Sequence, residues 1–129
     1  MSIFLAANNY ANCLVILERF EEARKLLRKT IPVARRVLGE GNILTLKMRW
    51  IYAETLVKDP AATLDNLREA VTTLQYVVSS ARRVLGGAHP ITVDIEEDLE
   101  GSRAALRARE GDDVSSVCEA VAAMTPGGA

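Results

Sequence analysis

The chain has 129 residues, of which 49% are hydrophobic, 26% charged and 5% aromatic. This length suits a single domain, and this composition can bury a core, which excludes a disordered chain. Sixteen basic and seventeen acidic residues give a formal net charge of −1. A nearly neutral chain has no general attraction to nucleic acid or to an acidic membrane surface, so we expect neither as a partner.

The two cysteines, Cys13 and Cys118, are too few for a disulfide framework and lack metal-ligand spacing. We interpret them as reduced, half-buried thiols. The first residues lack the basic region of a secretory signal, and no apolar run approaches the roughly 18 residues that span a bilayer. The sequence therefore predicts a cytoplasmic protein, and we expect no metal and no cofactor.

The first two predicted helices cover residues 3–17 and 20–38. In the second, apolar side chains recur at steps of three and four residues, which is one stripe of a 3.6-residue period. These residues are Phe20, Ala23, Leu27, Ile31, Ala34 and Leu38. Gly39 follows, and a glycine at this position can take the left-handed conformation that ends a helix.

The third predicted helix covers residues 43–57, with Asn42 as its N-cap. Its apolar residues form two faces. One face consists of Leu44, Met48, Tyr52 and Thr55 or Leu56, and the other of Leu46, Trp50, Ala53 and Val57. A helix with two apolar faces normally lies between two neighbours, so we expect this helix at the centre of the fold.

The fourth predicted helix, over residues 62–85, is a copy of the second. The segment Ala34–Gly39, A-R-R-V-L-G, recurs as Ala81–Gly86 at an offset of 47 residues. The same offset pairs other positions on both sides, including Phe20 with Leu67. A duplication of this kind indicates stacked repeats of one helical hairpin.

The fifth predicted helix covers residues 91–109 and follows His89-Pro90, because proline fits the first helical position. Gly111 then separates a weaker helix near 113–123, whose apolar residues are Val114, Val117, Cys118, Val121 and Met124. We expect this segment to cover the open face of the last repeat and the end of the chain to fray. The predicted division is a repeat domain over 1–110 and a C-terminal capping helix with a frayed tail over 111–129.

Two motifs resemble a tetratricopeptide repeat (TPR) of the kinesin light chain type. Phe20-Glu21-Glu22-Ala23 is similar to the aromatic-x-E-A step of that repeat, and Val84-Leu85-Gly86-Gly87-Ala88-His89-Pro90 resembles its closing turn. The likeness covers roughly residues 5–109, and an insertion at 59–63 lengthens the period beyond the usual value of about 34. The resemblance implies an all-α fold, a right-handed stack of antiparallel helix hairpins (a TPR-like α-solenoid) with about two and a half repeats plus a C-terminal helix.

For function, the resemblance implies a concave groove, lined by the first helix of each hairpin, that holds a peptide or helix of a partner protein. By register, the groove-facing residues are Asn8, Asn9, Asn12, Lys47, Trp50, Ile51, Glu54, Lys58, Asp94, Glu97 and Asp98. Asparagine amides can bind a peptide backbone, and Trp50 offers a rigid apolar anchor. The alternatives are a solvated polar face for the asparagines, a core position for Trp50, and a groove occupied by the C-terminal segment.

Charge is distributed unevenly along the predicted helices. The second helix is basic, whereas the fifth is acidic over Asp94–Glu100. One interpretation is that these are solvated faces with the acids at the N-terminal end of a helix dipole. The other is that they are complementary docking faces, for example with another copy of the chain.

The sequence contains no catalytic motif. His89 is the single histidine, and there is no Gly-rich phosphate loop, metalloprotease motif or nucleophile elbow. We therefore predict a protein-binding module and not an enzyme. The alternative is a structural fragment of a longer array or a self-associating, homodimeric unit, because few repeats are marginal alone.

Overall fold

The chain folds into five helices and, over the residues described, no strands. The computed structural model describes residues 3–124, apart from the side chains at positions 113, 115 and 116. The helices are α1 (Ile3–Ile16), α2 (Phe20–Val37), α3 (Ile43–Lys58), α4 (Leu64–Leu85) and α5 (Pro90–Met124). The predicted all-α fold class is confirmed.

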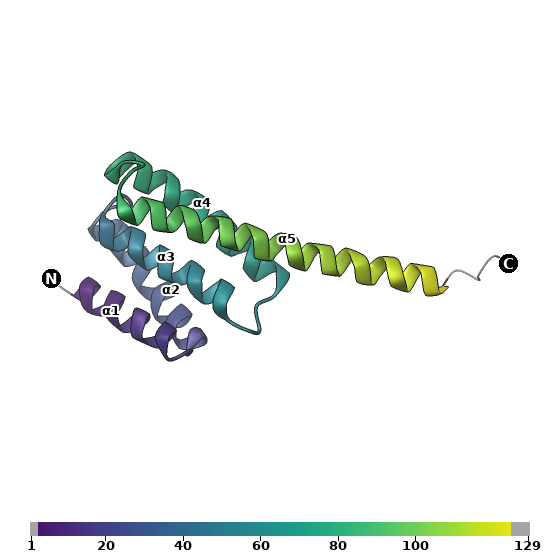
Figure 1. Ribbon diagram of the computed structural model, residues 1–129. Helices are drawn as coiled ribbons and strands as arrows, with labels where there is room; N and C mark the ends of the chain where they lie inside the picture. Colours follow the sequence, from purple (N-terminus) through teal and green to yellow (C-terminus); the bar gives the residue numbers. More distant parts are fainter. Residues whose placement is uncertain (1–2, 125–129) are drawn as a thin grey trace.

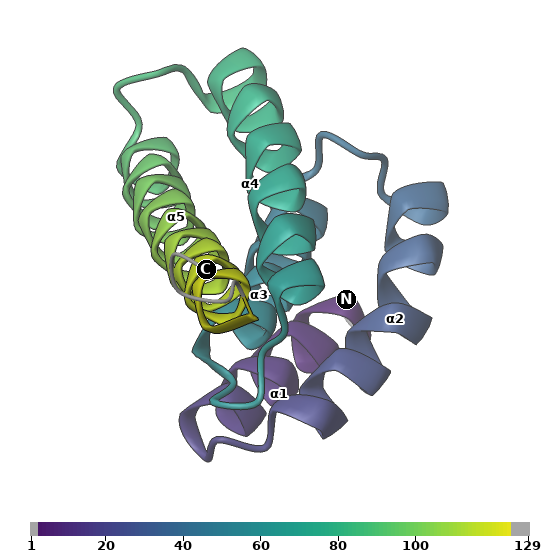
Figure 2. The ribbon, with the colours of Figure 1, turned by 90° about the vertical axis from the view of Figure 1, so that its right-hand side faces the viewer.

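The helices form antiparallel hairpins that stack side by side. α1 pairs with α2 and α3 pairs with α4, while α5 packs on α4 and also touches α3. Figure 1 shows the hairpins in sequence order, and the end-on view in Figure 2 shows α3 in the middle of the molecule. This arrangement of two hairpins and one further helix confirms the predicted TPR-like stack.

The core consists of two clusters of buried side chains, one on each side of α3. Met48 and Ile51 of α3 pack with residues of α1 and α2 in the first cluster. Leu46, Ala53 and Leu56 pack with residues of α4 and α5 in the second. The prediction that α3 has two apolar faces and lies between neighbours is thus confirmed.

The helix ends are fixed by glycines with positive φ and by side-chain caps. Gly39 and Gly86 have φ values of 94° and 91°, which non-glycine residues rarely adopt. The side chain of Asn42 accepts a hydrogen bond from the N–H of Leu44, as an N-cap does. Thr63 and Asn66 form a reciprocal capping box at the start of α4. These caps fix where each hairpin turns.

The C-terminal segment differs from the prediction. α5 runs without interruption from Pro90 to Met124, so the separate helix near 113–123 is part of α5. Gly111 does not break the helix, since a glycine costs only about 1 kcal/mol relative to alanine and positions 112–124 contain no proline. Beyond the stack, α5 projects into solvent (Figure 1). The expected tail from Thr125 lies outside the described residues, and a domain boundary at 110 stays a prediction.

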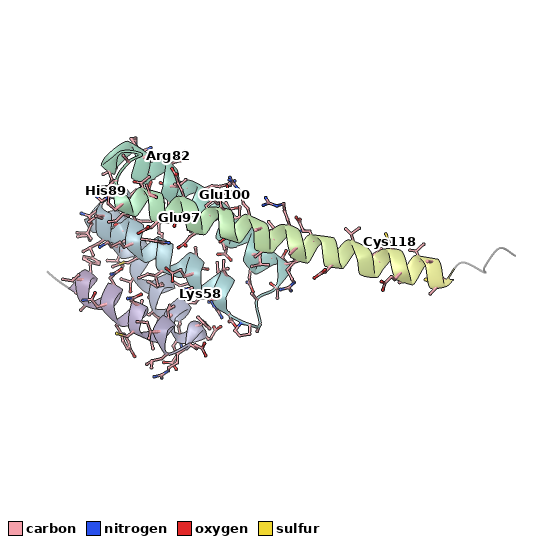
Figure 3. The ribbon with its side chains drawn as sticks, in the orientation of Figure 1. Lys58, Arg82, His89, Glu97, Glu100 and Cys118 are labelled. Carbon is pink, nitrogen blue, oxygen red and sulfur yellow. The ribbon has the colours of Figure 1, made fainter. Side chains whose placement is uncertain are left out.

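The two cysteines are both exposed and unpaired. Cys13 lies on α1 and Cys118 on the projecting part of α5, where Figure 3 labels it. The prediction that they are half-buried is wrong, because each lies on a helix face that no neighbouring helix covers.

Candidate partner-binding groove

A cavity of about 280 Å³ lies between α3 and α5. Its apolar lining comes from Ala53, Val57 and Leu74, beside the indole of Trp50. The polar lining residues are Glu54, Lys58, Glu97, Asp98 and Ser102, with Gly101 between them. Figure 3 labels Lys58 on α3 and Glu97 on α5. A cavity of this size can accommodate one large apolar side chain.

A second cavity of about 450 Å³ lies on the other side of α3, toward α1. Its lining residues are Asn12, Val15, Ile16, Glu18, Phe20, Glu54 and Lys58. Glu54 and Lys58 therefore line both cavities, and their Oε2 and Nζ atoms form an ion pair at 3.1 Å. The two cavities together, which we call the groove, cross α1, α3 and α5 with this ion pair between them.

Trp50 is half-buried and belongs both to the core and to the groove. Its ring packs against the core cluster between α3, α4 and α5. Its Nε1–H donates a hydrogen bond to Oδ2 of Asp98 at 2.6 Å. Both alternatives for Trp50 therefore hold in part, and the bond to Asp98 ties α3 to α5 across the groove.

Six of the predicted groove residues line one or both cavities, namely Asn12, Trp50, Glu54, Lys58, Glu97 and Asp98. Ile51 is only 7% exposed and packs in the cluster with α1 and α2, so it is a core residue rather than a groove-facing one. Its side chain packs with buried residues of α1 and α2.

The other four predicted residues, Asn8, Asn9, Lys47 and Asp94, lie outside both cavities. Asn9 and Asp94 are exposed, whereas Lys47 is half-buried. The Oδ1 atom of Asn8 is buried and, within residues 3–124, accepts no hydrogen bond. A role in binding for these four residues stays a prediction.

The sequence prediction missed several groove residues. Val57 and Gly101 follow Trp50 and Glu97 by seven and four residues, so helical periodicity could have identified them. Phe20 belongs to an apolar stripe that was assigned only to packing, and Val15 of α1 was not singled out. Leu74 comes from α4, the second helix of its hairpin, and no sequence signal shows that it reaches the groove between α3 and α5.

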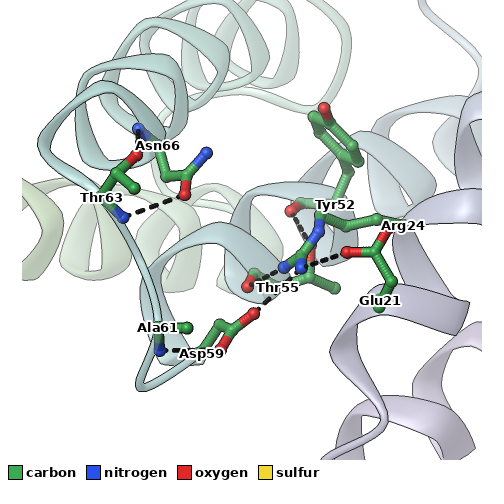
Figure 4. A network of polar contacts seen from close by, with 8 residues as sticks. All are labelled: Glu21, Arg24, Tyr52, Thr55, Asp59, Ala61, Thr63 and Asn66. Atoms are coloured by element: carbon green, nitrogen blue, oxygen red, sulfur yellow. Dashed lines mark hydrogen bonds and ion pairs between the residues drawn. The ribbon is translucent and has the colours of Figure 1, made fainter.

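The C-terminal end of α3, which carries Lys58, is fixed by a polar network around Arg24 of α2 (Figure 4). The Arg24 guanidinium donates hydrogen bonds of 2.9 Å to the Thr55 carbonyl oxygen and of 2.9 Å to Asp59 Oδ2. It also donates to Glu21 Oε2 at 2.9 Å. The N–H of Ala61 and the Arg24 guanidinium both lower the pKa of Asp59, because each stabilises the carboxylate form.

The single histidine, His89, lies at the start of a helix. His89 serves as the cap of α5, since its Nδ1 accepts a hydrogen bond from the N–H of Ile91 at 3.1 Å. In residues 3–124 there is no group of three or more His, Cys, Asp or Glu side chains that could hold a metal ion. Over the same residues, no helix combines the length and apolarity needed to cross a membrane.

Comparison with known proteins gives one match. Residues 5–43 match the family model described as tetratricopeptide repeat. No curated protein and no solved structure matches the chain. The matched residues contain most of α1, all of α2 and the turn that leads into α3. The first hairpin of this chain is therefore similar to a tetratricopeptide repeat, and the α3–α4 hairpin stacks on it in the manner of such repeats.

Proposed function

We propose that this protein is an interaction module that holds an apolar peptide or helix of a partner protein in the groove. The observation that carries the proposal is the cavity between α3 and α5, where apolar side chains are surrounded by polar and charged groups. Apolar area gives affinity on burial, and the surrounding polar groups select and orient the ligand. The similarity of the first hairpin to a tetratricopeptide repeat supports the same function.

The charges of the groove indicate which partner it favours. Lys58 is paired with Glu54, so the carboxylates of Glu97 and Asp98 leave the cavity between α3 and α5 negative. Asp98 already accepts the Trp50 indole N–H, which leaves its second oxygen and the Glu97 carboxylate for a ligand. We propose that the bound segment places a large apolar side chain in the cavity and a lysine or arginine beside it.

The proposal is tested by blocking the cavity without disturbing the fold. Gly101→Arg places a long side chain at the cavity, and nothing lies within 4 Å of the Cβ it would add. Gly111→Arg is the matched control, because Gly111 is also a helical glycine of α5 with open space around it but lies away from the groove. Proteins captured by the wild-type chain are identified, and their affinities are measured by calorimetry and by Trp50 fluorescence.

We expect Gly101→Arg to lower the affinity for a ligand that binds in the groove by about tenfold or more, equivalent to about 1.4 kcal/mol. Gly111→Arg should leave this affinity unchanged. The double variant Asn12→Ala, Lys47→Ala should also lower the affinity for an extended peptide, because both side chains are predicted to contact it. Ligands that bind the wild type and Gly101→Arg equally well would show that the groove is not the binding site.

The finer features of this function are also proposals. The Val84–Thr92 turn supports a repeat of the kinesin light chain type. A non-catalytic role is supported by the use of His89 as a helix cap. A cytoplasmic location is supported by two unpaired cysteines, which are typical of a reducing compartment.

A further inference from the structure

The face of α5 that packs on the stack continues beyond it. Leu99, Leu106, Val117 and Met124 follow one another at intervals of 7, 11 and 7 residues, which are close to whole numbers of helical turns. Leu99 is buried and Leu106 packs against the core cluster. Val117 and Met124, on the same stripe, are 58% and 80% exposed. One apolar face is thus covered by α3 and α4 in its first half and uncovered in its second.

The two helices that cover α5 reach only as far as the loop that joins them, between the end of α3 at Lys58 and the start of α4 at Leu64. Near this point Arg109 donates a hydrogen bond to the Ala62 carbonyl oxygen at 3.0 Å, and Glu110 forms an ion pair with Arg68 at 3.5 Å. From there α5 continues to Met124, away from α1 and α2 (Figure 1). The part of α5 after Glu110 is a single short helix, and such a helix is marginally stable in water unless its apolar face packs on another surface.

A matching surface lies at the opposite end of the stack. A cavity of about 250 Å³ is lined by residues of α1 and α2 alone, at the outer edge of the first hairpin. Tyr10, Leu14 and Leu26 provide its apolar lining, and Glu22, Lys25 and Lys29 its charged lining. Tyr10 is largely exposed. In a stack of hairpins, this edge is where a preceding helix would pack.

The two surfaces have opposite charge. Residues 110–124 contain four acidic residues and no basic one. α2 contains six basic residues and two acidic ones. Within the described part of the chain, Lys25 and Lys29 form no ion pair, so their charges are available to a partner. An acidic helix with an apolar face therefore complements this edge both in charge and in hydrophobicity.

We propose that the C-terminal half of α5 packs on the outer edge of the α1–α2 hairpin of a second copy of this chain. Val117 and Met124 cover Tyr10 and Leu26, and the basic α2 attracts the acidic helix. Because α5 leads away from its own first hairpin, the contact is between molecules. It is a head-to-tail contact, which produces either a closed exchange of helices between two copies or a longer chain of copies.

The first test measures molar mass against concentration by light scattering and sedimentation. The wild type should exceed its monomer mass of 14.1 kDa as concentration rises, and less so at high salt, because salt screens exposed charges. Val117→Asp should weaken association about tenfold or more, and its control Ala122→Asp, on the opposite face of the same exposed helix, should not. Lys29→Glu should weaken association several-fold. Its control is Arg83→Glu, which changes the net charge equally but should leave association unchanged.

The second test mixes the two impaired variants. Val117→Asp retains an intact α1–α2 edge and Lys29→Glu retains an intact α5 face, so a head-to-tail contact can still form between them. The mixture should therefore associate more strongly than either variant alone. A wild type that stays monomeric at about 1 mM overturns the proposal. The proposal is also overturned if both variants associate as strongly as the wild type, or if the mixture associates no more strongly than each variant alone. Either result would place the contact elsewhere.

Discussion

At the scale of single residues, Arg24 connects two helices through part-buried polar contacts. Its side chain is only 11% exposed and connects α2 to the last turn of α3 through Thr55 and Asp59. The last carbonyl groups of a helix lack intrahelical donors, so the guanidinium supplies a partner that the backbone does not. Arg19, by contrast, pairs with Glu22 on the surface of a single helix.

Arg24→Ala should lower the free energy of unfolding by about 1–3 kcal/mol, because it leaves part-buried acceptors without their donor. Arg19→Ala is the control and should cost much less than Arg24→Ala, because an exposed ion pair contributes little to stability. Urea unfolding followed by circular dichroism measures both values. Equal costs would show that the Arg24 network does not hold α2 to α3.

The Asp59 carboxylate gives this network a dependence on pH. Its pKa is lowered in the folded state, first by the Ala61 N–H and then by Arg24. Its contribution to stability is therefore fully present above the unfolded pKa of about 3.9 and is lost as the pH falls through the lower folded value. The difference in unfolding free energy between wild type and Asp59→Asn should hold from pH 7 to about pH 4 and shrink between about pH 4 and pH 3. A difference that stays constant over this range would contradict the assignment.

At the scale of helices and turns, two adjacent glycines after α4 have different roles. Gly86 has a φ of 91°, whereas Gly87 does not have a positive φ, and the space around both is open. Gly86→Ala should destabilise the protein by about 1 kcal/mol or more, since alanine is strained at that φ. Gly87→Ala should be neutral or slightly stabilising, because alanine loses less entropy on folding. Thermal unfolding of the two variants compares them directly.

The continuity of α5 through Gly111 can be tested in the same way. If the helix is unbroken there, Gly111→Ala should raise helix stability by about 1 kcal/mol, because no side chain lies near the added methyl group. Hydrogen exchange of the amides after residue 111 should slow correspondingly. No slowing, or faster exchange, would indicate that Gly111 ends a helix and that a boundary near 110 is real.

At the scale of the whole molecule, α3 makes the stack cooperative. Met48 belongs to the cluster with α1 and α2, and Leu46 to the cluster with α4 and α5. Met48→Ala should cost about 2–5 kcal/mol, as large-to-small substitutions in a core do. Because α3 belongs to both clusters, unfolding should remain a single transition when followed by Trp50 fluorescence and by circular dichroism. Two separate transitions would show that the hairpins unfold independently.

The helices of this fold and their order follow from signals within the sequence. Hydrophobic periodicity, the internal duplication, glycines and helix caps are local signals, and each depends on a few neighbouring residues. The bounds of helices α1 to α4 could therefore be predicted to within a few residues. The same periodicity identified six residues that line the groove, because positions on one helix face are fixed relative to each other.

Which helix faces are covered depends, by contrast, on how the helices pack together. Ile51 and Trp50 are adjacent in sequence, yet packing buries the first between α1 and α2 and leaves the second at the groove edge. Leu74 reaches the groove from α4, and α5 continues past Gly111 with its apolar stripe uncovered. Burial depends on the positions of neighbouring helices, and these follow from how two clusters of side chains fill space together rather than from any one segment.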